Sequence, residues 1–151
     1  MNRFPSKRTD DRAYTLIEII TVLLVIGILA AIAVSRFLSA QQDLVAQTDA
    51  IKAHLRFAQI KALNDDTGPW GIAFAGNSYT LQYNGAAAAI SLPAENSSTR
   101  TLSSGITITT PLTVSFDSWG SPGTSNIAIT LGDGGATTTI TITGNTGHIT
   151  P

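Results

Sequence analysis

The residue in the most unusual setting is Glu18, a lone carboxylate near the start of a long apolar run. From Ile19 to Ser35 there is no charged side chain. With the apolar residues before Glu18, this run is long enough to cross a hydrocarbon layer of about 30 Å. An unpaired carboxylate in such a layer costs roughly 2.5–3.5 kcal/mol on insertion scales. Nothing else in the run can neutralise Glu18, so we expect a partner from outside it.

Groups that could carry out catalysis are scarce in the rest of the chain. The two histidines, His54 and His148, lie far apart, and the sequence has neither a G-x-S-x-G elbow nor a P-loop. A Ser-His-Asp set could be assembled from His148 and Asp117, but any Ser-rich chain offers one by chance. We therefore interpret both histidines as surface or turn residues. The protein is predicted not to be an enzyme and to need no cofactor.

Metal ligands are equally sparse. Asp117 and Asp133 stand in turn-like segments rich in glycine. Calcium sites need six to eight oxygen ligands, and two isolated aspartates fall short of that number. We therefore interpret both as turn-forming residues and predict no metal site. The chain has no cysteine, which excludes disulfides and thiolate sites.

A helical pattern continues beyond the apolar run. No proline interrupts Tyr14 to Leu63, and Asn64–Pro69 is a strong stop signal. We expect a helix of about 50 residues, too long to be buried by so small a domain, so its first half must be covered by lipid and later by other subunits. Its second half is amphipathic. The stripe predicted to face the domain comprises Phe37, Gln41, Leu44, Thr48, Ile51, Leu55, Ala58 and Ala62.

After Pro69 the apolar period changes to two, which is typical of strands. Gly76-Asn77 predicts a hairpin, Ala86–Leu92 is a poorer strand, and Pro93–Ser98 is interpreted as a loop. The fold class is thus predicted to be α+β, with a long N-terminal helix packed on a small, mostly antiparallel sheet. The better strands are predicted at Trp70–Phe74, Tyr79–Tyr83, Ile106–Ile108, Leu112–Phe116, Ile127–Leu131 and Ile140–Ile142.

The N-terminal region resembles the prepilin signal of type IV pilins and type II secretion pseudopilins. The resemblance covers Arg12-Ala13-Tyr14-Thr15-Leu16-Ile17-Glu18-Ile19-Ile20 and the apolar helix to Phe37. It implies the pilin fold, cleavage by a prepilin peptidase between Ala13 and Tyr14, and N-methylation of Tyr14. We further hypothesise that Glu18 acts in subunit assembly by meeting the amine of an adjacent Tyr14. The alternative is that Glu18 lies at the headgroup level and is hydrated. The family mostly has Gly and Phe where this chain has Ala13 and Tyr14, which are mild replacements.

Other interpretations of the N-terminus explain less. A secretory signal has a shorter apolar stretch followed by its cleavage site, whereas residues 1–13 are hydrophilic and precede a longer run. A plain anchor would account for the run but not for Glu18. The predicted organisation is a cleaved leader at 1–13, a transmembrane and assembly helix at 14–36, its amphipathic continuation at 37–68 and a β-rich globular domain at 69–151.

Basic residues before the apolar run predict its orientation. Arg3, Lys7, Arg8 and Arg12 precede it, and Arg36 alone follows closely. The positive-inside tendency predicts an inner-membrane protein with one span, its leader in the cytoplasm and its C-terminal domain in the periplasm, which later enters a pilus or pseudopilus. The implied partners are other subunits through the N-terminal helix, prepilin peptidase, an inner-membrane assembly platform and, before assembly, membrane lipid.

The C-terminal region resembles the GspH/FimT-like and MSHA-type minor pilins in Phe116–Pro122, Ile127–Leu131 and Thr146–Ile149, and the helix part Leu55–Leu63 is similar too. This implies a minor pilin or pseudopilin, serving in adhesion, DNA uptake or type II secretion. The alternative is a ligand-binding minor pilin, either an adhesin or a DNA-binding protein. Lys52, Arg56 and Lys61 are predicted to share one helix face, which is usually solvated or meets a neighbouring subunit. We do not expect nucleic acid as a partner.

Overall fold

The computed structural model describes residues 15–150, and all of their side chains except those of residues 34–40. The predicted cleavage site, Ala13-Tyr14, lies outside the described residues. The chain divides into two compact units between Phe37 and Leu38, which are described separately. Helix α1 (Leu16–Leu63) belongs to both and is 48 residues long, which confirms the predicted long helix.

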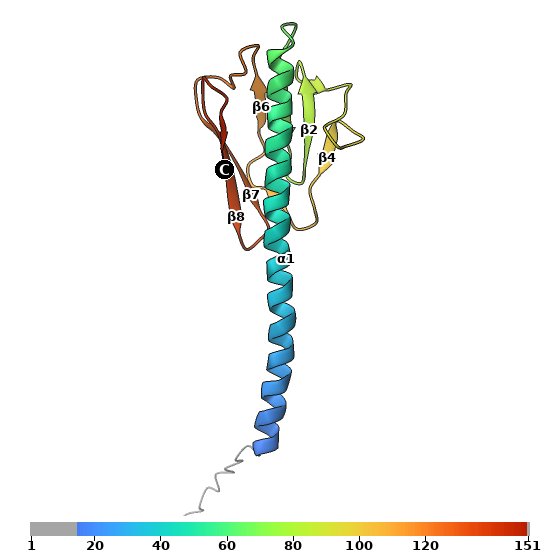
Figure 1. Cartoon of the computed structure of the whole chain (residues 1–151), viewed down its shortest axis with the longest axis vertical. Coiled ribbons are helices and arrows are strands. Elements are labelled where there is room, and N and C mark those ends of the chain that lie inside the picture. Colours follow the sequence, from blue (N-terminus) through green and yellow to red (C-terminus); the bar gives the residue numbers. More distant parts are fainter. Residues whose placement is uncertain (1–14, 151) are drawn as a thin grey trace, which may run out of the picture. The chain divides into compact units, whose positions relative to one another are not determined.

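The C-terminal unit contains two antiparallel sheets beside the second half of α1 (Figure 1). One sheet has the order β3-β2-β1-β6, with β4 also paired to β2, and the other has the order β5-β7-β8-β9. The strands are β1 (Trp70–Phe74), β2 (Ser78–Tyr83), β3 (Ala86–Ala87), β4 (Thr99–Thr101), β5 (Thr107–Ile108), β6 (Thr113–Phe116), β7 (Ile127–Gly132), β8 (Thr137–Ile142) and β9 (Ile149–Thr150).

The first hairpin forms where the sequence predicts it. Strands β1 and β2 pair from Trp70 opposite Tyr83 to Phe74 opposite Tyr79. The amide of Ala75 donates to the carbonyl of Ser78 at 2.8 Å, which closes the loop around Gly76-Asn77. The alternating residues of this hairpin therefore point to one face, where they meet the helix.

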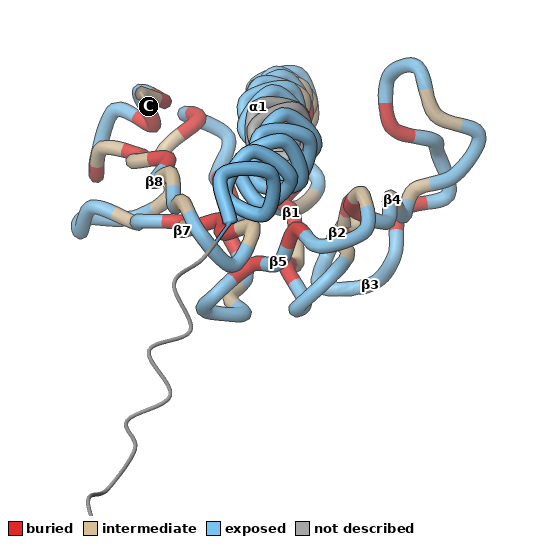
Figure 2. The backbone as a smooth tube through the Cα atoms, turned by 90° about the horizontal axis from the view of Figure 1, so that it is seen from below, coloured by how far each residue is buried: buried red, intermediate tan, exposed pale blue. Residues whose placement is uncertain are grey.

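A single apolar core joins α1 to both sheets. Viewed along α1, buried positions recur along the strands with exposed positions between them (Figure 2). Six members of the predicted helical stripe are buried: Leu44, Thr48, Ile51, Leu55, Ala58 and Ala62. Gln41 is exposed, so its assignment to the stripe was wrong. The Phe37 side chain lies outside the described part.

The sheet prediction needs three corrections. The described strands form two sheets rather than one. The poor strand predicted at Ala86–Leu92 shrinks to β3, because the chain then leaves β2 to form a loop that returns as β4. Neither β4 nor β9 was predicted, since both are two or three residues long and take their extended form from the partner strand. Such short pairings carry too little periodicity to be read from sequence.

Candidate functional site

Helix α1 begins with a capping residue that fixes the position of Glu18. The Thr15 hydroxyl accepts a hydrogen bond from the amide of Glu18 at 3.3 Å, and the Thr15 carbonyl accepts from the same amide at 3.0 Å. The spacing Thr15-x-x-Glu18 is that of a capping box, which satisfies amides that the first helical turn leaves free. Glu18 therefore lies in the first turn, near the positive end of the helix dipole.

The helix surface around Glu18 is apolar and uncovered. The segment Leu16–Ala33 has a mean hydropathy of 2.9 and none of it is buried. Its large apolar side chains are 48–76% exposed. Eighteen residues span about 27 Å of helix, so by length and composition this segment is suited to crossing a membrane.

Glu18 is the one acidic or basic residue in that segment. It is exposed and, with Ile19, Val22 and Leu23, lines a shallow hollow along the helix. Among the side chains that the structure describes, no basic group lies within ion-pair distance of it. The hydroxyl of Thr21, in contrast, donates to the Ile17 carbonyl at 2.8 Å and needs no outside partner. Glu18 is thus the one charged side chain of the apolar segment, and no described basic group neutralises it.

Comparison with protein families decides what this arrangement is. A profile described as the prokaryotic N-terminal methylation motif matches residues 8–34. The chain carries a prepilin-type signal. This signal is of the type IV pilin and pseudopilin kind, as the sequence predicted. Comparisons with curated proteins and with solved structures give no match.

The prepilin-type signal carries general consequences for this pilin-like chain. It implies processing by a prepilin peptidase and assembly with other pilin-type subunits. Together with the exposed apolar helix it fits anchoring in a membrane. The α+β arrangement of a long helix and antiparallel sheets is pilin-like. The individual roles of Ala13, Tyr14 and Glu18 stay predictions.

His54 corrects the interpretation of both histidines as surface or turn residues. Its side chain is only 3% exposed and lies between Tyr79, whose hydroxyl is 2.8 Å from Nδ1, and Pro93, whose carbonyl is 3.0 Å from Nε2. A carbonyl only accepts, so Nε2 carries the proton and the Tyr79 hydroxyl donates to Nδ1. Burial lowers the pKa of His54, which favours this neutral form. His148 is exposed, as predicted.

A polar network extends from the His54–Tyr79 pair to β4. Burial raises the pKa of Tyr79 to about 12, so it remains a hydroxyl donor. Arg100 lies 2.9 Å from the Glu95 carboxylate and donates to Gln47 at 3.4 Å. Gln47 in turn donates to Ser103 at 2.8 Å. The contacts of Gln47 tie α1 to β4 and to Ser103 in the loop after it.

The two loop aspartates are turn formers, as predicted. Asp117 accepts hydrogen bonds from the amides of Trp119 and Ser121, both at 2.9 Å. Asp133 accepts from the amides of Gly135 and Ala136, and these bonds lower its pKa. Within residues 15–150, no three His, Asp or Glu side chains are close enough together to hold a metal ion.

Gln59 makes a junction that the sequence did not reveal. Its side-chain amide donates to the carbonyls of Gly120 at 2.8 Å and Gly147 at 3.1 Å, and so joins two turns to α1. Trp119, in the first of these turns, is 86% exposed. The glycines in the C-terminal motifs indicated close turns at these positions, but they do not identify which helix residue contacts them.

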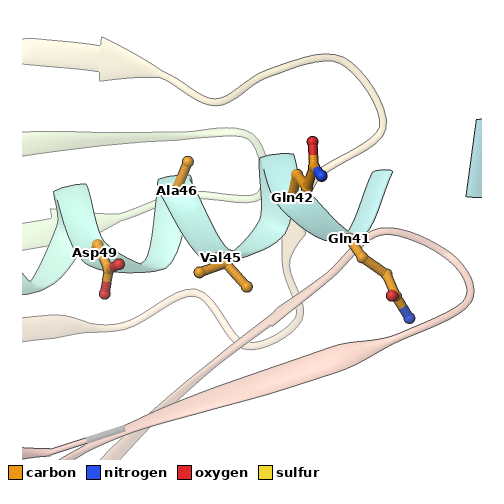
Figure 3. A pocket seen from close by; sticks show the side chains of 5 residues that line it. All are labelled: Gln41, Gln42, Val45, Ala46 and Asp49. Atoms are coloured by element: carbon orange, nitrogen blue, oxygen red, sulfur yellow. The ribbon is translucent and has the colours of Figure 1, made fainter. Parts of the chain in front are cut away.

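Two of the three cations on the predicted basic face of α1 have contacts within the protein. Lys52 lies 2.6 Å from Asp49, and Lys61 lies over the rings of Phe57 and Trp70. A hollow nearer the start of this unit is lined by α1 alone, and its side chains spread over the helix surface without converging on one point (Figure 3). Its lining is Gln41, Gln42, Val45, Ala46 and Asp49. We assign it no chemistry.

Proposed function

We propose that this chain is a minor pilin or pseudopilin, a structural subunit that enters a type IV pilus or type II secretion pseudopilus after cleavage and N-methylation. One observation carries the proposal: the prepilin-type signal at residues 8–34 coincides with an uncovered apolar helix whose single charge is Glu18. The role is that of a building block, with no catalytic step performed by this chain.

Energetics connect Glu18 to assembly. In the bilayer a lone carboxylate costs roughly 2.5–3.5 kcal/mol. Cleavage before Tyr14 creates a new amine four residues away in sequence. When helices bundle with a stagger, the amine of one subunit meets Glu18 of its neighbour, and charges about 4 Å apart attract by about 4 kcal/mol at an effective dielectric of 20. An out-of-register neighbour leaves the carboxylate unpaired, so the pair selects the correct stagger.

The proposed route follows from charge and hydropathy. The chain inserts once into the inner membrane, with Arg3, Lys7, Arg8 and Arg12 in the cytoplasm and the C-terminal unit in the periplasm. An assembly platform then draws the helix into a bundle of like helices. The apolar side chains between Leu16 and Ala33, uncovered in the single chain, exchange lipid for neighbouring subunits.

The test replaces Glu18 by its uncharged isostere. Glu18→Gln should insert in the membrane normally, because it removes a charge from the apolar segment. It should nevertheless be depleted from sheared filaments by at least about tenfold, the equivalent of about 1.4 kcal/mol. Asp43→Asn is the matched control, since Asp43 is an exposed acid of α1 outside the apolar segment. Quantitative immunoblots of membrane and filament fractions supply the ratio. Equal incorporation of both variants would refute the pairing.

Processing is tested separately on the same filaments. Intact mass should correspond to a chain that begins at Tyr14 and carries one added methyl group. Filaments whose subunits retain Met1 would contradict the proposed function itself, whatever the Glu18 variants do.

A further inference from the structure

A hollow on the C-terminal unit lies where α1 meets the end of the chain. Its volume is about 350 Å³, and residues from α1 and from the segment that leads into β9 line it. The helix contributes Arg56 and the apolar residue Ile60, which is 55% exposed. The segment before β9 contributes His148, which is exposed. The hollow thus combines two nitrogen donors with apolar surface.

The walls of this hollow are held in place by the Gln59 junction. Gln59 bridges the carbonyls of Gly120 and Gly147. Gly147 has a φ of +64°, and a Cβ there would lie 2.1 Å from the Gly120 carbonyl oxygen, so only glycine fits. The segment that carries His148 is therefore fixed relative to α1, which keeps ordering costs on binding small.

A comparison of the charges singles out Arg56. Four basic residues lie between positions 41 and 150. Lys52 and Arg100 form ion pairs with Asp49 and Glu95, and Lys61 lies over aromatic rings. Within that same stretch, Arg56 has neither an ion-pair nor a hydrogen-bond partner. The one basic side chain there without a contact to another protein group is therefore the one that lines the hollow.

We propose that this hollow binds a side-chain carboxylate of a neighbouring pilin-type subunit. The inference rests on the proposed function and extends it with a contact between C-terminal units. Arg56 supplies a forked pair of donors that matches a carboxylate, and His148 offers an N–H in either protonation state. Ile60 accepts the apolar stem of an aspartate or glutamate.

The charge balance favours a protein carboxylate over nucleic-acid phosphate. Residues 38–150 contain four basic and seven acidic side chains, a formal charge of −3. Nucleic-acid binding draws its affinity from several basic contacts to a highly charged backbone, whereas this surface offers one unpaired cation. Neighbouring subunits, by contrast, need only one acid at the right place.

The decisive experiment is zero-length cross-linking in intact filaments. Arg56→Lys keeps the charge and supplies an amine, which a carbodiimide joins to any carboxylate in direct contact. Lys52, one helical turn earlier and 2.6 Å from Asp49, is an internal positive control. We expect mass spectrometry to find an amide between position 56 and an Asp or Glu of another pilin-type subunit. Absence of that amide while the Lys52–Asp49 link forms would overturn the proposal.

A second measurement compares Arg56→Gln with Lys52→Gln, which loses the same charge outside the hollow. Filament incorporation should fall about fivefold for Arg56→Gln, the upper end for a partly exposed ion pair, and stay near wild type for Lys52→Gln. Equal incorporation of the two variants contradicts the inference. So does duplex-DNA binding by the detergent-solubilised full chain that Arg56→Gln abolishes.

The Glu18 variants distinguish a failure of this inference from a failure of the proposed function. If Glu18→Gln is depleted from filaments but position 56 forms no cross-link, the inference alone fails. If the wild-type chain never enters filaments, the proposed function fails and the inference falls with it.

Discussion

The buried histidine predicts a specific dependence of stability on pH. His54 is held neutral between the Tyr79 hydroxyl and the Pro93 carbonyl. Burial lowers its pKa from 6.5, and the nearby Arg100 cation acts in the same direction, while the Pro93 bond and Glu95 oppose the shift. A protonated ring would need an acceptor at Nδ1, where the Tyr79 hydroxyl now donates. Protonation should therefore destabilise the folded state.

The sign and size follow from proton linkage. Below about pH 6.5 the unfolded chain binds a proton at His54 that the folded chain does not, so the free energy of unfolding falls as pH falls. The slope for one group is at most about 1.4 kcal/mol per pH unit. The stabilisation that comes from keeping His54 neutral is fully present above about pH 6.5. The lowered pKa of Asp133 acts in a separate window, below its ordinary value of 3.8.

The assay is denaturant unfolding of the detergent-solubilised full chain between about pH 7.5 and about pH 5.5. Trp70, 9% exposed, reports on the core, and a Trp119→Phe background removes the signal of the 86% exposed tryptophan. His54→Gln keeps a donor and an acceptor but does not titrate, so the slope should disappear. His148→Gln, the exposed counterpart, should keep it.

Two results would refute this reasoning. One is a wild-type free energy of unfolding that does not change across this pH range. The other is loss of the slope in His148→Gln with its retention in His54→Gln. Either would mean that His54 is not the group whose protonation is suppressed by folding.

Three further variants test the packing, each by denaturant unfolding. Leu55→Ala, at a fully buried position, should cost about 2–5 kcal/mol; a cost below about 1 kcal/mol would contradict the packing of α1 on the sheets. Gly147→Ala should destabilise by more than about 1 kcal/mol, because its Cβ meets the Gly120 carbonyl; an unchanged midpoint would disprove the close junction. Trp119→Ala should change stability by less than about 0.5 kcal/mol, since the side chain is exposed; a larger loss would show that it packs.

Local patterns were sufficient for the helix and the first hairpin. The absence of proline up to Leu63 and the stop at Asn64–Pro69 predicted α1, because helix limits depend on neighbouring residues. The Gly76-Asn77 turn predicted the pairing of β1 with β2, since a short loop sets the register of a hairpin. The sequence also showed the setting of Glu18, because a single charge in an apolar run is a property of the sequence alone.

The rest depends on contacts between distant residues. His54 was expected at the surface, but it bonds to Tyr79 and Pro93, 25 and 39 positions away. Gln59 carries no local sign of a partner, yet it joins turns 61 and 88 positions away. A polar side chain has the same local pattern whether it is solvated or buried with partners, because its hydrogen bonds are settled only when the sheets close on the helix.

The sequence by itself determined the N-terminal chemistry: a prepilin-type signal, a membrane-length apolar helix and one carboxylate within it. These follow from composition and spacing along a single helix. The tertiary structure alone decided that Arg56 and His148 line one hollow. Their proximity arises from packing the end of the chain against α1, which no local period encodes.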